Sequence, residues 1–85
     1  MTIKVLYRRN LKMSDGKLSA QVAHAVKNLG KTPVDCDIIV LKASDTKFEE
    51  RIKKLVDTNR KYYIQVDKGL TEVEQGTATA VAWVE

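Results

Sequence analysis

The sequence contains only one cysteine, Cys36, and only one histidine, His24. A single cysteine excludes an intrachain disulfide, and these two residues are too few to form a structural zinc site. We therefore expect a protein of the reducing cytoplasm that uses neither a metal nor another cofactor.

Long apolar runs and a phosphate-binding loop are also missing. No stretch is apolar over the roughly 20 residues that a membrane helix needs. Lys4 interrupts the first apolar stretch, which argues against a signal peptide, and the four glycines lack the spacing of a nucleotide-binding loop. At 85 residues, 44% of them hydrophobic, the chain is expected to fold as one globular domain over 1–85.

Positive charge is concentrated in the first third of the chain, although the whole sequence carries a net charge of only +4. Residues 1–31 contain seven basic residues and one acidic residue, whereas the remainder is slightly acidic. Such a distribution favours a polyanionic partner bound by one face. Ordinary solubilising charge explains this feature equally well.

Alternation and helical spacing predict six elements in the order β-α-β-α-β-β. The predicted strands cover 2–8, 37–43, 61–66 and 77–84, and the predicted helices cover 16–29 and a segment that begins at Ser44, Asp45 or Thr46. The uninterrupted apolar run 38–41 is typical of a strand that is covered on both faces. In the last strand, simple alternation places on one face Thr77, Thr79, Val81 and Trp83.

This order predicts an α/β fold with three layers, α/β/α, and a four-stranded mixed sheet whose last strand is antiparallel. Right-handed crossovers place the two helices on opposite faces of the sheet. Ligands of such sheets gather at the carboxyl ends of the strands, where the winding direction reverses. Lys17 comes after the loop that leaves the first strand, and Asp67 follows the third strand, so we expect both side chains at the same edge.

Lys17 is unusual because it occupies the first turn of the predicted helix, where the partial positive charge of the helix end favours an acidic residue. A cation held there creates a site for an anion or a developing negative charge. An ordinary solvated lysine is the alternative. One cation, one carboxylate and two hydroxyls suffice to position water for attack on an ester, and here these groups are Lys17, Asp67, Thr71 and Thr79.

Two stretches carry a set of residues at characteristic spacings. In the first stretch these are Arg8, Leu11, Met13, Gly16, Lys17, Ala20, Gln21, His24 and Ala25. In the second they are Asp67, Gly69, Thr71, Gly76 and Thr79. The first set resembles the opening motif of the type 2 peptidyl-tRNA hydrolase family, R-x-D-L-x-M-x-x-G-K-x-A-A-Q-x-x-H-A. The second resembles that family's I-x-D-x-G-x-T motif and the glycine and threonine after it.

The resemblance implies hydrolysis of the ester between a peptide and the 3′ end of tRNA. It assigns the catalytic roles to Lys17, Asp67, Thr71 and Thr79. In the resulting hypothesis, Asp67 and Thr79 direct the attacking water, Lys17 stabilises the oxyanion, and Thr71 holds Asp67 or the substrate. The residues expected to contact RNA are Arg8, Arg9, Lys12, Gln21 and His24. A purely structural role in the helix is an equal alternative for His24.

Departures from the family pattern keep other functions open. Asn10 stands where the family has aspartate, Leu70 replaces a basic residue, and Glu72 and Glu74 add negative charge near the expected RNA. The chain also lacks a helix between 28 and 37 and the family's terminal helix, so we expect a homodimer to cover the sheet. The rival functions are a non-catalytic RNA-binding or regulatory module and a small structural domain that binds another protein.

Overall fold

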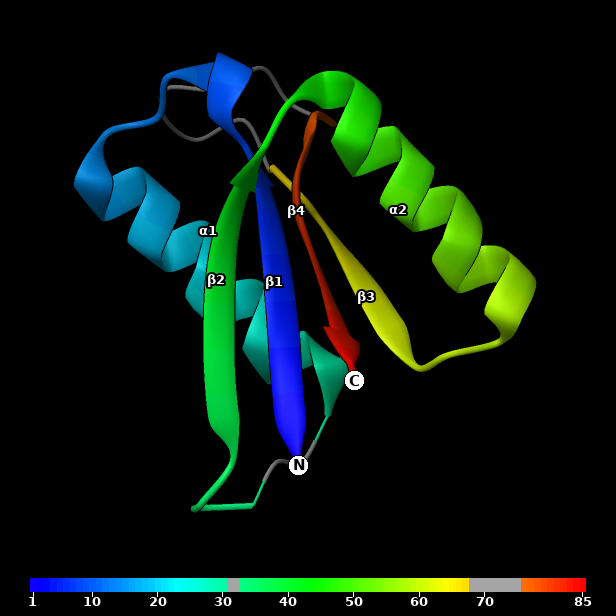
Figure 1. Ribbon diagram of the computed structural model, residues 1–85. Coiled ribbons are helices and arrows are strands. Elements are labelled where there is room, and N and C mark those ends of the chain that lie inside the picture. The colour runs from blue at the N-terminus through cyan, green and yellow to red at the C-terminus, as the bar shows by residue number, and fades with distance from the viewer. Residues whose placement is uncertain (31–32, 68–75) are drawn as a thin grey trace.

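The computed structural model describes residues 1–30, 33–67 and 76–85 (Figure 1). In chain order its elements are β1 (Thr2–Arg8), the 3-10 helix η1 (Arg9–Leu11), α1 (Asp15–Leu29), β2 (Asp37–Ala43), α2 (Asp45–Thr58), β3 (Tyr62–Val66) and β4 (Ala78–Val84). The predicted order β-α-β-α-β-β is confirmed, and every strand boundary lies within one residue of its predicted position. Most of the loop expected at 67–76 lies outside the described residues.

The four strands form one mixed sheet in the order β2-β1-β4-β3. β1 pairs in parallel with β2, and β4 pairs antiparallel with both β1 and β3. β4 therefore runs against the other three strands, as the sequence predicted. As a result, the carboxyl ends of β1, β2 and β3 meet at one edge of the sheet.

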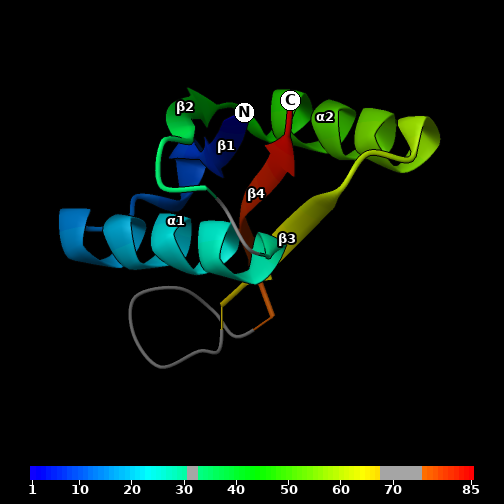
Figure 2. The same cartoon turned by 90° about the horizontal axis from the view of Figure 1, so that it is seen from below.

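The two helices cover opposite faces of the sheet, which confirms the three-layer arrangement (Figure 2). The core on the α1 face consists of Ile3, Val5, Ala25, Leu29, Ala80 and Ala82. The core on the α2 face consists of Phe48, Leu55, Val81 and Trp83. Strand alternation produces this division, because neighbouring residues of a strand point to opposite faces. Each large apolar side chain buried in this way stabilises the fold by about 1.5–3 kcal/mol.

Both helices begin with a serine cap. The Ser14 side chain accepts a hydrogen bond from the Lys17 backbone N–H, and the Ser44 side chain accepts one from the Lys47 backbone N–H. α1 ends at Leu29, as the sequence predicted, and Gly30, whose φ of 126° suits glycine, follows it as the C-terminal cap. Of the helices in the described residues, none is long and apolar enough to cross a membrane.

β2 is less covered than the sequence predicted. Ile38, Ile39, Val40 and Leu41 point alternately to the two faces, yet each is between 43% and 50% exposed. β2 is an edge strand, and α1 packs mainly over β3 and β4, so an apolar groove of about 610 Å³ remains between α1 and β2. The prediction that both faces are covered is wrong, because an apolar run reports hydrophobicity and not the presence of covering helices.

β4 contains a β-bulge near its start. In the pairing with β3, Gln65 lies opposite Ala80, but the next residue, Val66, lies opposite Ala78. Thr79 is therefore an extra residue in β4, and the alternation of side chains slips at this point.

The bulge turns Thr79 toward α1. Its hydroxyl donates a hydrogen bond to Gln21 of that helix, whereas Val81 packs in the core on the α2 face. The prediction that Thr77, Thr79, Val81 and Trp83 share one face is wrong, because ideal alternation takes no account of a bulge.

Candidate active site

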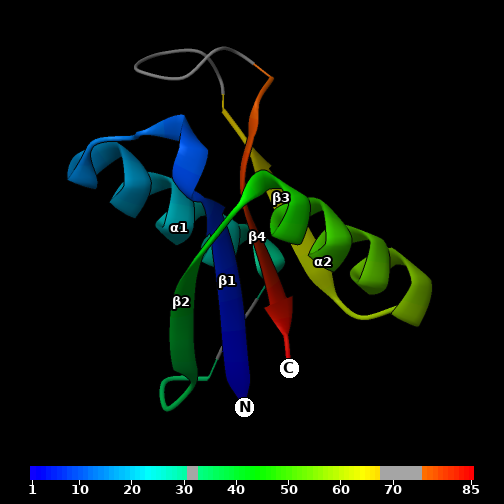
Figure 3. The ribbon, with the colours of Figure 1, turned by 45° about the horizontal axis from the view of Figure 1, so that its top comes forward.

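The candidate site lies at the edge of the sheet where the carboxyl ends of β1 and β3 meet (Figure 3). β1 leads through η1 into the first turn of α1, which carries Lys17. β3 ends at Val66, and Asp67 follows it directly. The topology thus brings together two residues that are 50 positions apart in the chain.

Lys17 and Asp67 form an ion pair, in which Lys17 Nζ donates a hydrogen bond to Asp67 Oδ1. The Lys17 side chain is 10% exposed and the Asp67 side chain only 1%. Burying a charge is costly unless it is paired, so each of these groups depends on the other. The expectation that the two side chains meet at this edge is confirmed.

The backbone of Asp67 is fixed as well. Its N–H donates to the Thr77 carbonyl, and its carbonyl accepts from the Gly76 N–H, both over 2.9 Å. Gly76 has a φ of 86°, a conformation that glycine adopts without strain. Because these hydrogen bonds join the end of β3 to the residues before β4, the carboxylate is held in place beside Lys17.

Thr79 and Gln21 form a second polar contact on the α1 face. The Thr79 hydroxyl donates to Gln21 Oε1 over 2.6 Å, and the Gln65 carbonyl oxygen lies 3.3 Å from the same hydroxyl. Gln21 lies about one helical turn after Lys17, so both residues project from the same side of α1. Gln21, expected to contact RNA, is instead turned inward and only 5% exposed.

Gln65 is a residue of this site that the sequence pattern did not single out. Its side-chain Nε2 donates to the Val66 carbonyl over 3.3 Å. Its Oε1 is buried without a hydrogen-bond partner in the part of the chain that the structure describes. A buried acceptor of this kind suits a water molecule. A polar residue two positions before Asp67, in an otherwise mostly apolar strand, is the signal that would have indicated it.

Arg8, which was expected to contact RNA, is held by contacts inside the protein. Its Nε donates to Asp45 Oδ1 over 2.9 Å, and its Nη1 donates to the Ala78 carbonyl over 3.0 Å. The guanidinium carbon also lies 5.8 Å from the centre of the Phe48 ring. Hydrogen bonds from Arg8 and, to a lesser extent, from Asn10 hold the pKa of Asp45 below its ordinary value.

The other residues that the sequence singled out for catalysis or RNA contact are either exposed to solvent or lie outside the residues that the structure describes. The exposed ones, which are accessible to a ligand, are Arg9, Lys12 and His24. Those outside the described residues are Leu70, Thr71, Glu72 and Glu74. Within the described ranges, no group of three or more His, Cys, Asp or Glu side chains is placed to hold a metal ion.

A comparison with protein families gives a result that agrees with this arrangement. Residues 1–84 match the family model described as peptidyl-tRNA hydrolase PTH2. A search of curated proteins finds no match. The matched range includes every strand and helix that the structure describes and both residues of the buried ion pair. The chain therefore belongs to the peptidyl-tRNA hydrolase PTH2 family, as its two sequence motifs indicated.

Proposed function

We propose that the protein hydrolyses the ester bond between tRNA and a peptide or another N-blocked aminoacyl group. The observation that carries this proposal is the buried Lys17–Asp67 pair at the carboxyl edge of the sheet, in a chain of this family. A cation and a carboxylate in one place are the groups that ester hydrolysis needs. A non-catalytic RNA-binding module would need surface cations, but it would not need a charged pair withdrawn from solvent.

In the proposed reaction, Asp67 and Thr79 direct a water molecule onto the carbonyl carbon of the ester. The carboxylate accepts a proton from this water as the water oxygen attacks, and Gln65 Oε1 offers a further acceptor. The bond between the carbonyl carbon and the ribose oxygen then breaks. The accepted proton passes to the ribose oxygen, which gives a free tRNA hydroxyl. The peptide carboxylic acid formed at the same time releases the second proton of the water to solvent and becomes a carboxylate.

Lys17 stabilises the negative charge that develops on the carbonyl oxygen. Its ammonium has three N–H donors, of which the contact with Asp67 uses one. Its place in the first turn of α1 adds the partial positive charge of the helix end. We assign Thr71 to holding Asp67 or the substrate.

The proposed RNA contacts near this edge are the exposed residues Arg9, Lys12 and His24. Phosphate contacts of this kind give affinity without sequence preference. Arg8 and Gln21 support the site through their internal contacts, and any RNA contact by them stays a prediction. We place the protein in the cytoplasm, where translation supplies peptidyl-tRNA.

The proposal is tested by measuring, under single-turnover conditions, the rate at which the protein releases the N-blocked amino acid from N-blocked aminoacyl-tRNA. Lys17→Arg keeps the charge but moves it, and Asp67→Asn keeps the size of the side chain but removes the carboxylate. Each is expected to lower the rate by at least about 100-fold. Lys27→Gln changes an exposed lysine near the other end of α1 and is the control, which should keep the wild-type rate.

Circular dichroism spectra establish that each variant is folded before its rate is compared. Equal rates for wild type and folded Asp67→Asn would contradict the proposed mechanism. A wild-type protein that binds tRNA but never releases the amino acid would support the non-catalytic module instead.

We also propose that two copies associate through β2. Its half-exposed apolar residues and its outer edge, which pairs with no strand among the described residues, match a second copy of the same strand. Val40→Lys, in the middle of β2, is expected to give monomers in sedimentation equilibrium. Val56→Lys, at a similarly exposed valine of α2, is the control and should remain dimeric. A monomeric wild type would contradict the proposal.

A further inference from the structure

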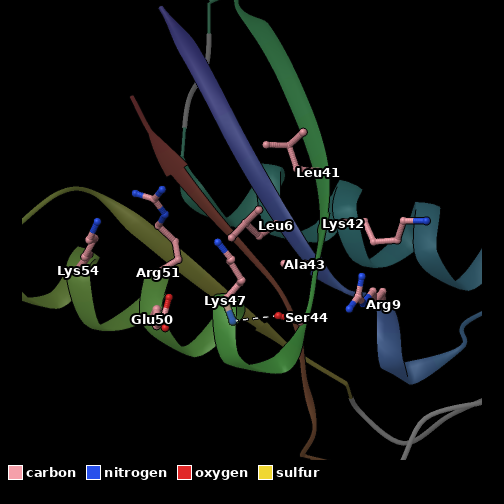
Figure 4. A pocket seen from close by; sticks show the side chains of 10 residues that line it. All are labelled: Leu6, Arg9, Leu41, Lys42, Ala43, Ser44, Lys47, Glu50, Arg51 and Lys54. Atoms are coloured by element: carbon pink, nitrogen blue, oxygen red, sulfur yellow. Dashed lines mark hydrogen bonds between the residues drawn. The ribbon is translucent and has the colours of Figure 1, made fainter.

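A hollow of about 560 Å³ lies on the α2 face of the sheet, opposite the face that α1 covers. Figure 4 shows the side chains that line it, which come from α2, η1 and the carboxyl ends of β1 and β2. Its apolar lining is formed by Leu6, Leu41 and Ala43. We call this feature the basic hollow, because its other lining residues are mostly cationic.

The cations that line the basic hollow are Arg9, Lys42, Lys47, Arg51 and Lys54. One acidic side chain, Glu50, accompanies them. Within the described residues none of these five cations forms a salt bridge, whereas Lys4, Arg8 and Lys17 each pair with a carboxylate. The basic hollow therefore carries positive charge that the protein does not neutralise, and such a surface attracts a polyanion.

The cations stand on two sides of the hollow. Lys47, Arg51 and Lys54 are spaced by four and three residues along α2, so they project from one side of the helix and span about 10 Å. Arg9 follows the end of β1, across from them, whereas the side chain of Lys42 extends from the rim of the hollow toward the other face of β2 (Figure 4). A chain of phosphates lying in the hollow would meet the three cations of α2 on one side and Arg9 on the other.

Arg51 is oriented by an aromatic ring. Its guanidinium carbon lies 4.9 Å from the centre of the Trp83 ring. A guanidinium stacked in this way still presents the N–H groups at its edge, which match the oxygens of a phosphate. The apolar side chains of Leu6 and Leu41 lower the local dielectric constant and strengthen the attraction between these charges and an anion.

We infer that the basic hollow binds the phosphodiester backbone of RNA. Arg9 and Lys42 stand at the same sheet edge as Lys17 and Asp67, so RNA whose 3′ end reaches the ion pair can continue into the hollow. The lining residues in the described part of the chain include no aromatic side chain for base stacking, so the hollow recognises backbone and not sequence. The identification of this RNA as the body of tRNA rests on the proposed function.

Equilibrium binding of deacylated tRNA, measured by fluorescence anisotropy over a range of salt concentrations, tests the inference. The double variant Lys47→Gln/Lys54→Gln removes two cations of the hollow. The matched control, Lys27→Gln/Lys53→Gln, removes two exposed lysines that do not line it. The first variant should bind at least about fivefold more weakly at low salt, and its slope of log Kd against log salt should fall by about 1 to 2. The control should stay near the wild-type slope.

Equal losses in the two variants would overturn the inference, because they would show that only net charge matters. Binding by Lys47→Gln/Lys54→Gln that equals wild-type binding would overturn it as well. Deacylated tRNA lacks the carboxylic ester that the proposed enzyme would cleave, so this measurement does not depend on hydrolysis. A failure of the RNA-binding inference is therefore distinguishable from a failure of the proposed enzymatic function.

Discussion

Lys17 and Asp67 form an ion pair whose two charges are almost completely withdrawn from solvent. Such a pair is sensitive to the loss of one partner, because the other charge is then left buried without compensation. Replacing both partners together costs much less, since no buried charge remains. Stability measurements can therefore separate the structural contribution of the pair from its role in the reaction.

Lys17→Met is expected to lower the free energy of unfolding by about 3–5 kcal/mol, because it leaves the Asp67 carboxylate unpaired. The double variant Lys17→Met/Asp67→Asn should regain most of this loss while hydrolysis stays abolished. Urea denaturation at neutral pH, followed by circular dichroism, measures both values. A double variant no more stable than Lys17→Met would contradict the prediction.

Thr79→Val keeps the volume of the side chain but removes the hydroxyl that donates to Gln21. We expect it to lower the free energy of unfolding by about 1–3 kcal/mol, because the Gln21 oxygen stays buried without that donor. Thr77→Val lies outside this contact and should change stability by no more than about 0.5 kcal/mol. Thr79→Ser keeps a hydroxyl and should hydrolyse the ester faster than Thr79→Val, and the opposite order would count against the proposed role of Thr79.

Asp45 makes stability depend on pH in a defined direction. Its hydrogen bond from Arg8 lowers its pKa in the folded state below the ordinary value of 3.8. A lowered pKa contributes stability above the ordinary value, and this contribution is lost as the pH falls through the folded-state pKa. The melting temperature of Asp45→Asn should therefore lie below that of wild type at pH 7, and the gap should close below about pH 4. A gap that persists unchanged at pH 2 would refute this explanation.

Gly16, in the first turn of α1, and Gly30, directly after its last residue, should respond oppositely to replacement by alanine. Gly30 has a φ of 126°, which alanine adopts only with strain, so Gly30→Ala should cost about 1–3 kcal/mol. The added methyl group would also meet Lys61 Nζ at 2.6 Å, but this flexible side chain can move aside. Gly16 lies within the helix with open space around it, so Gly16→Ala should stabilise by about 0.5 kcal/mol. Thermal unfolding of both variants tests the contrast, which similar changes in the two would disprove.

The order and boundaries of the elements could be predicted from periodicity because the local patterns and the packing agree. Ile3 and Val5 alternate toward the α1-side core as a regular strand requires. The bulge at Thr79 could not be predicted in the same way, because it changes which residues pair without changing the sequence pattern. The exposure of β2 also escaped prediction, since it depends on where the helices pack and not on the strand itself.

The meeting of Lys17 with Asp67 was predictable from a general rule, namely that ligand sites lie at the carboxyl ends of strands in α/β sheets. The basic hollow could not be predicted from the sequence. The cations of α2 have the spacing of ordinary solvent-facing charge, and only the packing of α2 beside Arg9 and the carboxyl end of β2 makes them one surface. Charge clusters that combine distant parts of a chain require the tertiary structure to be recognised.

The outer edge of β2 also affects how the protein behaves at high concentration. A strand that is apolar on both faces can recruit similar strands from partly unfolded neighbours and start fibre growth. Asp37 and Lys42 bracket the apolar run, and in-register parallel stacking would place like charges directly against each other. In the dimer proposed above, antiparallel pairing would avoid this repulsion and occupy the free β2 edge of each copy, so growth through this edge would stop at two.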